Sequence, residues 1–171
     1  MRERAKRVKM LILDIDGVMT DGRIIYDSKG NELKCFNVLD GMGFVLLGQA
    51  KIKVALITAK GSKAVLRRAR DIGAVEIKRN AIDKLTAFRQ ILKKHGLSAK
   101  DICFMGDDLL DLPVMRRAGL AVAVPGACGE VKRAARYVTK KEGGKGAVRE
   151  VIEVILRAQN KWRKLVGKYD R

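Results

Sequence analysis

Three short apolar runs in this sequence lead directly into acidic or hydroxyl residues. The runs and their polar ends are Met10–Ile15 with Asp14 and Asp16, Ile52–Thr58 with its final threonine, and Ile102–Met105 with Gly106-Asp107-Asp108. Apolar runs of this length without alternation are typical of strands that are buried on both faces of a parallel sheet. Helical segments of about 10 to 15 residues separate the runs, which favours an α/β fold with a doubly wound, mostly parallel sheet.

The remaining pattern predicts further elements around these strands. A β-hairpin is expected from Arg23–Asp27 and Glu32–Val38, joined by a turn at residues 28–31. Further expected elements are a helix from Ser62 through Ile72, a strand at 75–78, a helix from Asp83 to Gly96, a helix at 109–118, a strand at 120–124 and a last helix at about 146–165. We therefore predict one domain over residues 1–171, with a hairpin inserted at about 22–38 and a C-terminal helix at about 146–166.

The charge balance is strongly basic. There are 37 Lys and Arg against 19 Asp and Glu, which gives a net charge of +18. A field of this sign attracts nucleic acid, anionic lipid or small phosphorylated acids, or it belongs to a solvated surface with ion-pair networks suited to a hot environment. Composition alone leaves these four interpretations open.

The cysteines and the apolar runs indicate an intracellular chain. Cys35, Cys103 and Cys128 are odd in number and widely spaced, so we expect buried reduced thiols and no disulfide framework. The run MLIL behind the basic N-terminus is too short for the core of a signal peptide, and no run approaches the roughly 20 residues of a membrane helix. The expected location is cytoplasmic.

The polar strand ends predict a metal site. Ligands of open α/β sheets bind at the carboxyl ends of the strands, where Asp14, Asp16 and Asp107 are expected to meet. Carboxylates that lie close together repel one another unless a cation neutralises them. Mg²⁺ prefers oxygen ligands and keeps coordination places for water and phosphate. A strand end and turn without function is the alternative for any single one of these motifs.

Four motifs in register resemble the haloacid dehalogenase superfamily of phosphatases. They are Asp14-Ile15-Asp16-Gly17-Val18, Leu56-Ile57-Thr58, Lys84 and Gly106-Asp107-Asp108-Leu109-Leu110-Asp111. The resemblance implies that Asp14 attacks phosphorus and forms an aspartyl-phosphate, and that Asp16 protonates the leaving alkoxide and later activates water. It implies that Thr58 binds a phosphoryl oxygen and that Lys84 offsets its charge.

The same resemblance assigns the metal ligands. Asp14, the backbone carbonyl of Asp16, and Asp107 would hold Mg²⁺, while Asp108 and Asp111 would support the ligands or cap a helix. Roughly 40 residues separate Asp16 from Thr58 and roughly 25 separate Thr58 from Lys84. These gaps leave no room for the cap domain that many members carry.

A closer resemblance is to the capless 3-deoxy-D-manno-octulosonate (KDO) 8-phosphate phosphatases. The segments that carry it are residues 16–22, 36–43 and the glycine run with its helix start at 143–150. The resemblance implies a homotetramer for lipopolysaccharide biosynthesis, in which the hairpins form a barrel and a neighbour's C-terminal segment covers the site. Taken alone, the glycines more often mark an ordinary surface loop.

The resemblance also implies a substrate pocket. Its residues would be Asp16, Asn37, Val38, Leu39, Asp40, Gly41, Lys60, Arg68 and Lys84. The sequence departs from the family at Leu39 and Val45, where many members carry arginine, at Ala59-Lys60, where Gly-Arg is usual, and at Lys145. Lysine keeps the charge of arginine but loses its bidentate geometry. A nine-carbon acid phosphate of the sialic or nonulosonic type is therefore an alternative substrate.

Two other classes of function fit parts of the sequence. A phosphatase for nucleic-acid ends would use the +18 charge and an open site, although aromatic residues for base stacking make up only 5%. A catalytically silent binding module is the non-enzymatic alternative. Such a module would usually have lost Asp14, Asp16 or Lys84, and all three are present.

Overall fold

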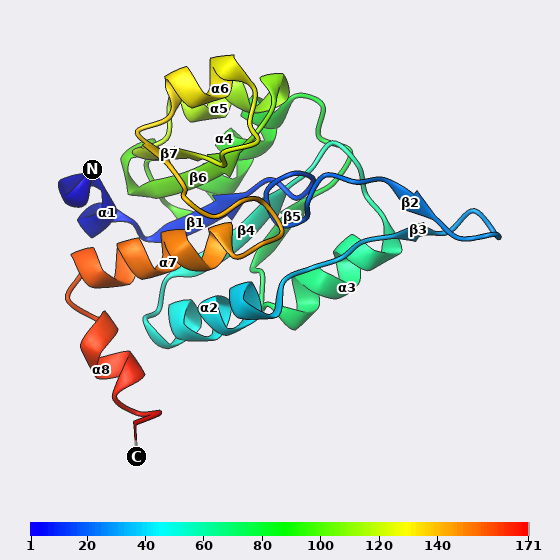
Figure 1. Cartoon of the computed structure of the whole chain (residues 1–171). Coiled ribbons are helices and arrows are strands. Elements are labelled where there is room, and N and C mark those ends of the chain that lie inside the picture. Colours follow the sequence, from blue (N-terminus) through cyan, green and yellow to red (C-terminus); the bar gives the residue numbers. More distant parts are fainter. Residues whose placement is uncertain (171) are drawn as a thin grey trace.

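The computed structural model describes residues 1–170, and its centre is a six-stranded parallel sheet (Figure 1). The strand order is β5-β4-β1-β6-β7-β8. The strands are β1 (Met10–Leu13), β4 (Lys53–Ile57), β5 (Glu76–Lys78), β6 (Ile102–Gly106), β7 (Leu120–Ala123) and β8 (Tyr137–Val138). This arrangement confirms the doubly wound α/β fold that the apolar runs predict. The strand β8 has no counterpart in the sequence prediction.

Helices cover both faces of the sheet. One face carries α2 (Val38–Gln49), α3 (Lys63–Asp71) and α7 (Ala147–Ala158), and the other carries α4 (Lys84–His95), α5 (Leu112–Met115) and α6 (Gly129–Ala134) (Figure 1). Two elements near the N-terminal ends of the strands, α1 (Arg2–Arg7) and the 3₁₀ turn η1 (Ala99–Asp101), complete the body. All residues of β1, β6 and β7 are buried, so the core lies along the central strands.

The chain reverses direction in the sheet between β1 and β6. From β1 it proceeds to β4 and β5 on one side, and it then returns through α4 to β6 on the other side. Leu13 pairs with Leu56 of β4 and with Met105 of β6, so the carboxyl ends of these three strands are level. Such a reversal leaves a crevice at the carboxyl ends, which is where ligands of this fold bind.

Local signals in the sequence position the helices next to this crevice. The side chain of Ser62 accepts a hydrogen bond from the backbone N–H of Val65 and begins α3. Asp83 does the same with Thr86 and begins α4, which ends at Gly96 in a left-handed conformation. Both starts and the Gly96 end agree with the sequence prediction.

Three predicted elements have different bounds. The second hairpin strand, β3 (Glu32–Leu33), ends early because Asn37 caps α2, so that Val38 is helical. The segment at 109–118 is a 3₁₀ turn, η2 (Leu109–Asp111), followed by the four residues of α5. The last predicted helix is two helices, α7 and α8 (Trp162–Val166), because the chain adopts a left-handed conformation at Asn160 (φ 56°) between them.

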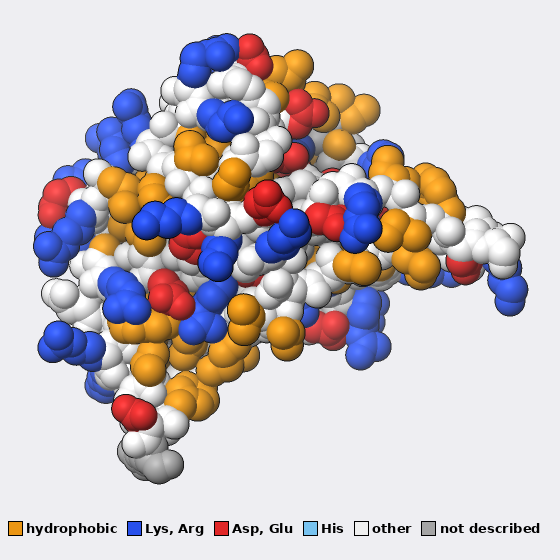
Figure 2. Space-filling view, in the orientation of Figure 1, with side chains coloured by type: hydrophobic (Ala, Val, Ile, Leu, Met, Phe, Trp, Pro, Cys, Tyr) orange, Lys and Arg blue, Asp and Glu red, His pale blue; other side chains and the backbone are white. Residues whose placement is uncertain are grey.

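The hairpin of β2 (Ile25–Tyr26) and β3 extends away from the body (Figure 1). Apolar side chains cover much of its surface in Figure 2, and Ile24, Tyr26 and Leu33 are each at least half exposed. Lys and Arg side chains on the same view are spread among acidic and apolar ones. The basic charge is therefore distributed over this face.

None of the helices within residues 1–170 is long and apolar enough to cross a membrane.

The three cysteines carry free thiols, as the sequence predicts. Cys103 is buried in β6, and burial raises the pKa of its thiol. Cys35 is exposed, which differs from the expected burial because it follows the projecting strand β3.

Candidate active site

The polar strand ends meet in one pocket of about 250 Å³ at the carboxyl end of the sheet. Asp14 follows β1, Thr58 follows β4, Asp107 follows β6, and Lys84 is the first residue of α4. The lining residues are Asp14, Asp16, Gly17, Gly22, Ile24, Glu32, Lys34, Thr58, Ala59, Lys60, Lys84, Asp107, Asp108 and Leu110. All of the residues predicted to be catalytic or to bind metal are among them.

Lys84 connects two carboxylates at the bottom of the pocket. Its Nζ lies 2.9 Å from Oδ1 of Asp14 and donates a 2.7 Å hydrogen bond to Oδ1 of Asp111. Burial alone would lower the pKa of Lys84, but Asp14 and Asp111 outweigh burial and raise it. The side chain is therefore a fixed cation next to Asp14.

Three carboxylates form a cluster here, and two of them, Asp14 and Asp111, contact the ammonium of Lys84. One oxygen from each of Asp14, Asp107 and Asp111 lies within 4.8 Å of the others. Burial and repulsion from Asp111 raise the pKa of Asp14 to about 8, and the same two causes raise that of Asp107 to about 6. The excess of negative charge is relieved either by protons or by a cation.

The donor set fits a hard divalent cation. All three carboxylates offer oxygen ligands, and Oδ1 of Asp107 is buried without a hydrogen-bond partner among the described residues. A buried carboxylate oxygen without a partner is costly, and a metal ion in the pocket would supply the missing contact.

Asp111 is the most constrained of the three carboxylates. It has no solvent exposure, and its Oδ2 accepts hydrogen bonds from the backbone N–H groups of Asp107 (3.0 Å) and Asp108 (3.3 Å). The side chain lies so close to Gly106 that a Cβ at that position would come within 2.5 Å of it. Asp111 thus caps the start of η2, one of the two roles that the sequence predicts for it.

Gly17 allows Asp107 to approach the loop after β1. Its φ is +82°, and a Cβ there would lie 2.0 Å from Oδ2 of Asp107. The glycine run after β8 packs on the same loop, because a Cβ at Gly143 would lie 1.7 Å from the carbonyl oxygen of Gly17. The backbone N–H of Gly144 also donates to the carbonyl of Val18 at 3.1 Å. The glycine run is therefore packed against the site of its own chain.

Asp16 has a partner that the sequence analysis missed. Lys34, which directly follows β3, donates a hydrogen bond to Oδ1 of Asp16 and lies 3.0 Å from Oε1 of Glu32. The alternation Glu32-Leu33-Lys34 was the available signal, since residues two apart in a strand share a face. Here both charged residues line the pocket while Leu33 is exposed.

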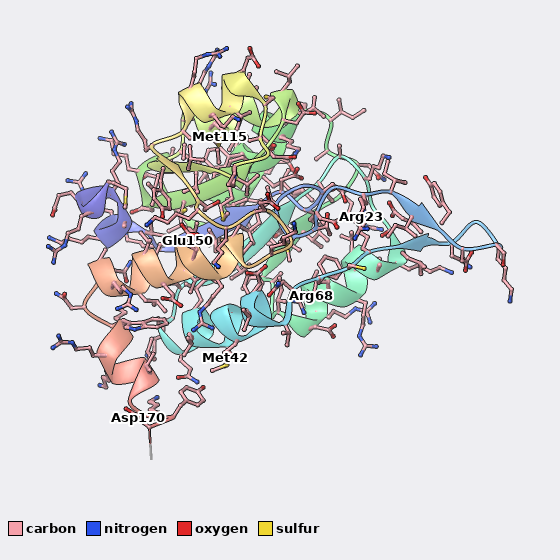
Figure 3. All side chains as sticks on the ribbon, viewed as in Figure 1. Arg23, Met42, Arg68, Met115, Glu150 and Asp170 are labelled. Carbon is pink, nitrogen blue, oxygen red and sulfur yellow. The ribbon has the colours of Figure 1, made fainter. Side chains whose placement is uncertain are left out.

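The predicted substrate residues fall into two groups. Asp16, Lys60 and Lys84 line the pocket, and the hydroxyl of Thr58 donates to the carbonyl oxygen of Lys60 at 2.8 Å. The second group, residues 37–41 with Arg68, lies around the start of α2. Figure 3 shows Arg68 beside the first turn of that helix.

Within the second group, Arg68 contacts the two residues that directly precede α2. Its Nη2 donates to the carbonyl oxygen of Asn37 at 3.2 Å, and its guanidinium stacks on the Phe36 ring at 5.3 Å. Val38 and Leu39 are exposed. Asp40 is buried and accepts a 2.7 Å hydrogen bond from the backbone N–H of Arg149 at the start of α7.

Comparisons with known proteins agree with this geometry. A family model for haloacid dehalogenase-like hydrolases matches residues 54–152. The 3-deoxy-D-manno-octulosonate 8-phosphate phosphatase KdsC of Yersinia pestis is 43% identical over 93% of this chain and 85% of the relative. KdsC of Escherichia coli strain K12 is 42% identical over 92% and 84%.

Solved structures extend the likeness to the whole fold. The 3-deoxy-D-manno-octulosonate 8-phosphate phosphatase of Moraxella catarrhalis, in complex with magnesium ion, phosphate ion and KDO, is 42% identical with a TM-score of 0.96, covering 98% of this chain and 97% of that one. The cobalt-bound phosphatase of Haemophilus influenzae is 38% identical with a TM-score of 0.89, covering 92% of both chains.

Proposed function

This chain belongs to the haloacid dehalogenase-like hydrolases and, within them, to the 3-deoxy-D-manno-octulosonate 8-phosphate phosphatases, and we propose that it hydrolyses KDO 8-phosphate to KDO and phosphate. The observation that carries the proposal is the buried cluster in which Lys84 lies 2.9 Å from Asp14, beside Asp107. The likeness to a phosphatase whose structure holds magnesium, phosphate and KDO supports the same substrate.

Mg²⁺ is the proposed cofactor. Asp14, the backbone carbonyl of Asp16, and Asp107 would hold it, and the unpartnered Oδ1 of Asp107 supports this assignment. When bound, the ion neutralises carboxylate charge and draws electron density from the phosphoryl group. The magnesium and cobalt ions in two related phosphatases are consistent with a divalent cation.

The proposed reaction has two displacements at phosphorus. A carboxylate oxygen of Asp14 forms a bond to phosphorus while the bond to the sugar oxygen breaks, and Asp16 gives its proton to that oxygen. Asp16, now a carboxylate, then takes a proton from water, and the resulting hydroxide attacks phosphorus. Phosphate leaves, and Asp14 and the protonated Asp16 are regenerated.

Thr58 and Lys84 are proposed to hold the phosphoryl group. The hydroxyl of Thr58 is buried at the end of β4 and can exchange its hydrogen bond to the Lys60 carbonyl for one to a phosphoryl oxygen. The ammonium of Lys84 is already fixed beside Asp14, so it offsets charge on the transferring group without a change of position.

The sugar acid is proposed to contact residues from both groups described above. Lys60 lies at the pocket, while Asn37, Val38, Leu39, Asp40, Gly41 and Arg68 surround the start of α2. We propose that the protein is a homotetramer in the cytoplasm. In this assembly the C-terminal segment of a neighbouring subunit would cover the pocket and the start of α2. The exposed apolar side chains of the hairpin support an assembly of this kind.

A nine-carbon acid phosphate is the second candidate substrate. The observation that favours it is Leu39, whose exposed apolar side chain stands at a position where many family members carry arginine. Together with Lys60, this leaves fewer bidentate donors for a carboxylate than the family pattern provides.

A substrate panel tests the proposal. The values of kcat/KM are measured with Mg²⁺ for KDO 8-phosphate, a nine-carbon acid 9-phosphate, a 3′-phosphorylated oligonucleotide and p-nitrophenyl phosphate. We expect KDO 8-phosphate to exceed p-nitrophenyl phosphate by at least about tenfold, which corresponds to about 1.4 kcal/mol of transition-state binding. A higher value for another phosphate ester would overturn the assignment of the substrate.

A further inference from the structure

Lys34 is an unusually buried lysine for a residue on a projecting hairpin. Only 3% of its side chain is exposed, whereas Ile24, Tyr26 and Leu33 around it are largely exposed. An ammonium group is rarely buried unless it is paired. Here Nζ lies between the carboxylates of Asp16 and Glu32, so the hairpin directs its one buried cation into the pocket.

The contact with Asp16 involves a single carboxylate oxygen. Lys34 donates to Oδ1, and Oδ2 of Asp16 has no hydrogen-bond partner among residues 1–170. The Asp16 side chain is 36% exposed, and Lys34 is the only side chain in the described chain that bonds to it. Without this bond, the carboxyl group would be free to rotate at the mouth of the pocket.

Glu32 holds the other side of Lys34. Its Oε1 lies 3.0 Å from Nζ, and its own side chain is only 16% exposed. The ammonium is therefore held between Glu32, two residues earlier in the chain, and the carboxyl group of Asp16.

We propose that Lys34 is a positioning residue that orients Asp16 for proton transfer to the leaving group. The inference rests on the proposed function, in which Asp16 is the general acid. Lys34 holds Oδ1, and the proton on Oδ2 passes to the sugar oxygen as the bond between that oxygen and phosphorus breaks. Orientation of an acid within hydrogen-bond reach of its target is a large part of its effect on rate.

The leaving group provides a test that a purely structural role would not pass. Release of p-nitrophenolate needs little protonation, whereas release of a sugar alkoxide depends on it. The value of kcat/KM reports the first displacement, so it is measured for p-nitrophenyl phosphate and for the best alkyl phosphate of the panel. The test variant is K34M, and D16N serves as the reference for loss of the acid. The matched control is K29M, because Lys29 lies in the exposed hairpin turn.

We expect K34M to lower kcat/KM for the alkyl phosphate by about 10²-fold and for p-nitrophenyl phosphate by less than about tenfold, in the pattern of D16N. K29M should match the wild type with both substrates. K34R, which keeps a cation at this position but changes its shape, should recover part of the loss and not all of it. Retained activity of K34M on p-nitrophenyl phosphate also shows that the variant folds.

Equal losses of K34M on both substrates would overturn the positioning role, as would wild-type activity on both. If K34M is unfolded by circular dichroism, K34R decides: unequal losses support the proposal and equal losses contradict it. A wild-type protein that hydrolyses no phosphate ester refutes the proposed function itself. If D16N loses kcat/KM equally on the alkyl phosphate and on p-nitrophenyl phosphate, Asp16 is not the general acid, and the inference about Lys34 fails with it.

Discussion

A Cβ placed on Gly17 would lie 2.0 Å from Oδ2 of Asp107, although the two residues are 90 positions apart in the chain. The loop after β1 and the end of β6 can approach each other this closely only because the side chain at position 17 is a hydrogen atom. The glycine of the first motif therefore determines where the carboxylate of the last motif lies. Both are needed to form the proposed metal site.

The variant G17A tests this dependence. We expect it to fold with a loss of about 1–2 kcal/mol from the positive φ, and to bind Mg²⁺ at least about tenfold more weakly because Asp107 must move. Magnesium titration by calorimetry measures the change. The control is G30A in the hairpin turn, where φ is +77° and no atom lies within 4 Å of the added Cβ. Equal Mg²⁺ affinity in G17A and G30A would contradict the account.

The pKa values of Asp14 and Asp107 predict how the metal-free protein depends on pH. Both are raised in the folded chain, to about 8 and about 6, from an ordinary 3.8. Between pH 5 and 8 the folded chain therefore binds more protons than the unfolded chain, so the free energy of unfolding falls as pH rises. The stabilising contribution of these two groups to the free energy of unfolding is complete below about pH 4. It is lost as the pH rises past 6 for Asp107 and past 8 for Asp14.

Magnesium reverses this trend, because its binding requires deprotonated carboxylates. We expect the rise in Tm on addition of Mg²⁺ to be larger at pH 8 than at pH 6. Thermal unfolding with EDTA and with Mg²⁺ over this range measures both effects. A Tm in EDTA that increases steadily from pH 5 to 8 would be inconsistent with a buried cluster of three carboxylates that shares one ammonium group.

Asp111 is expected to be a structural requirement of the site. Replacement D111A leaves two backbone N–H groups without their acceptor and removes one partner of buried Lys84. We expect the free energy of unfolding to fall by about 3 kcal/mol, and reduced repulsion toward Asp14 to offset only part of that loss. Urea unfolding in EDTA measures the change. The control D108A removes an exposed cap of the same turn and should cost about 1 kcal/mol.

Asp40 is expected to contribute to the start of α7. That helix has Gly146 as its N-cap and no side-chain cap of its own, and Asp40 accepts from the N–H of Arg149 instead. The change D40A should lower the free energy of unfolding by about 2 kcal/mol. D71A, which breaks an exposed pair with Arg67, should stay within about 0.5 kcal/mol of the wild type. Equal changes in the free energy of unfolding for D40A and D71A would show that the contact between Asp40 and α7 does not stabilise the fold.

The sequence predicted the features that depend on local chemistry. The buried strands β1, β4 and β6 follow from apolar runs, and the caps at Ser62 and Asp83 from single side chains that bond three residues ahead. The convergence of Asp14 and Asp107 follows from the position of strand ends in a parallel sheet. These features need no knowledge of distant contacts.

The features that the sequence did not predict depend on distant contacts. Lys34 enters the pocket because the base of the hairpin lies beside the loop that carries Asp16, and Asp40 is buried because α7 begins beside α2. The break between α7 and α8 occurs within an amphipathic pattern that continues across it. There, the two guanidinium groups of Arg149 and Arg157 stack on Trp162.

The central claim is that Asp14 is the nucleophile, and a trapped intermediate tests it most directly. The protein is mixed with Mg²⁺ and KDO 8-phosphate, quenched in acid within one turnover, digested and measured by mass spectrometry. We predict one phosphoryl group on the peptide that contains Asp14, and its absence in the folded variant D14N, which should release no phosphate. Phosphate release by D14N at the wild-type rate, with no phosphorylated peptide in the wild type, would contradict the claim.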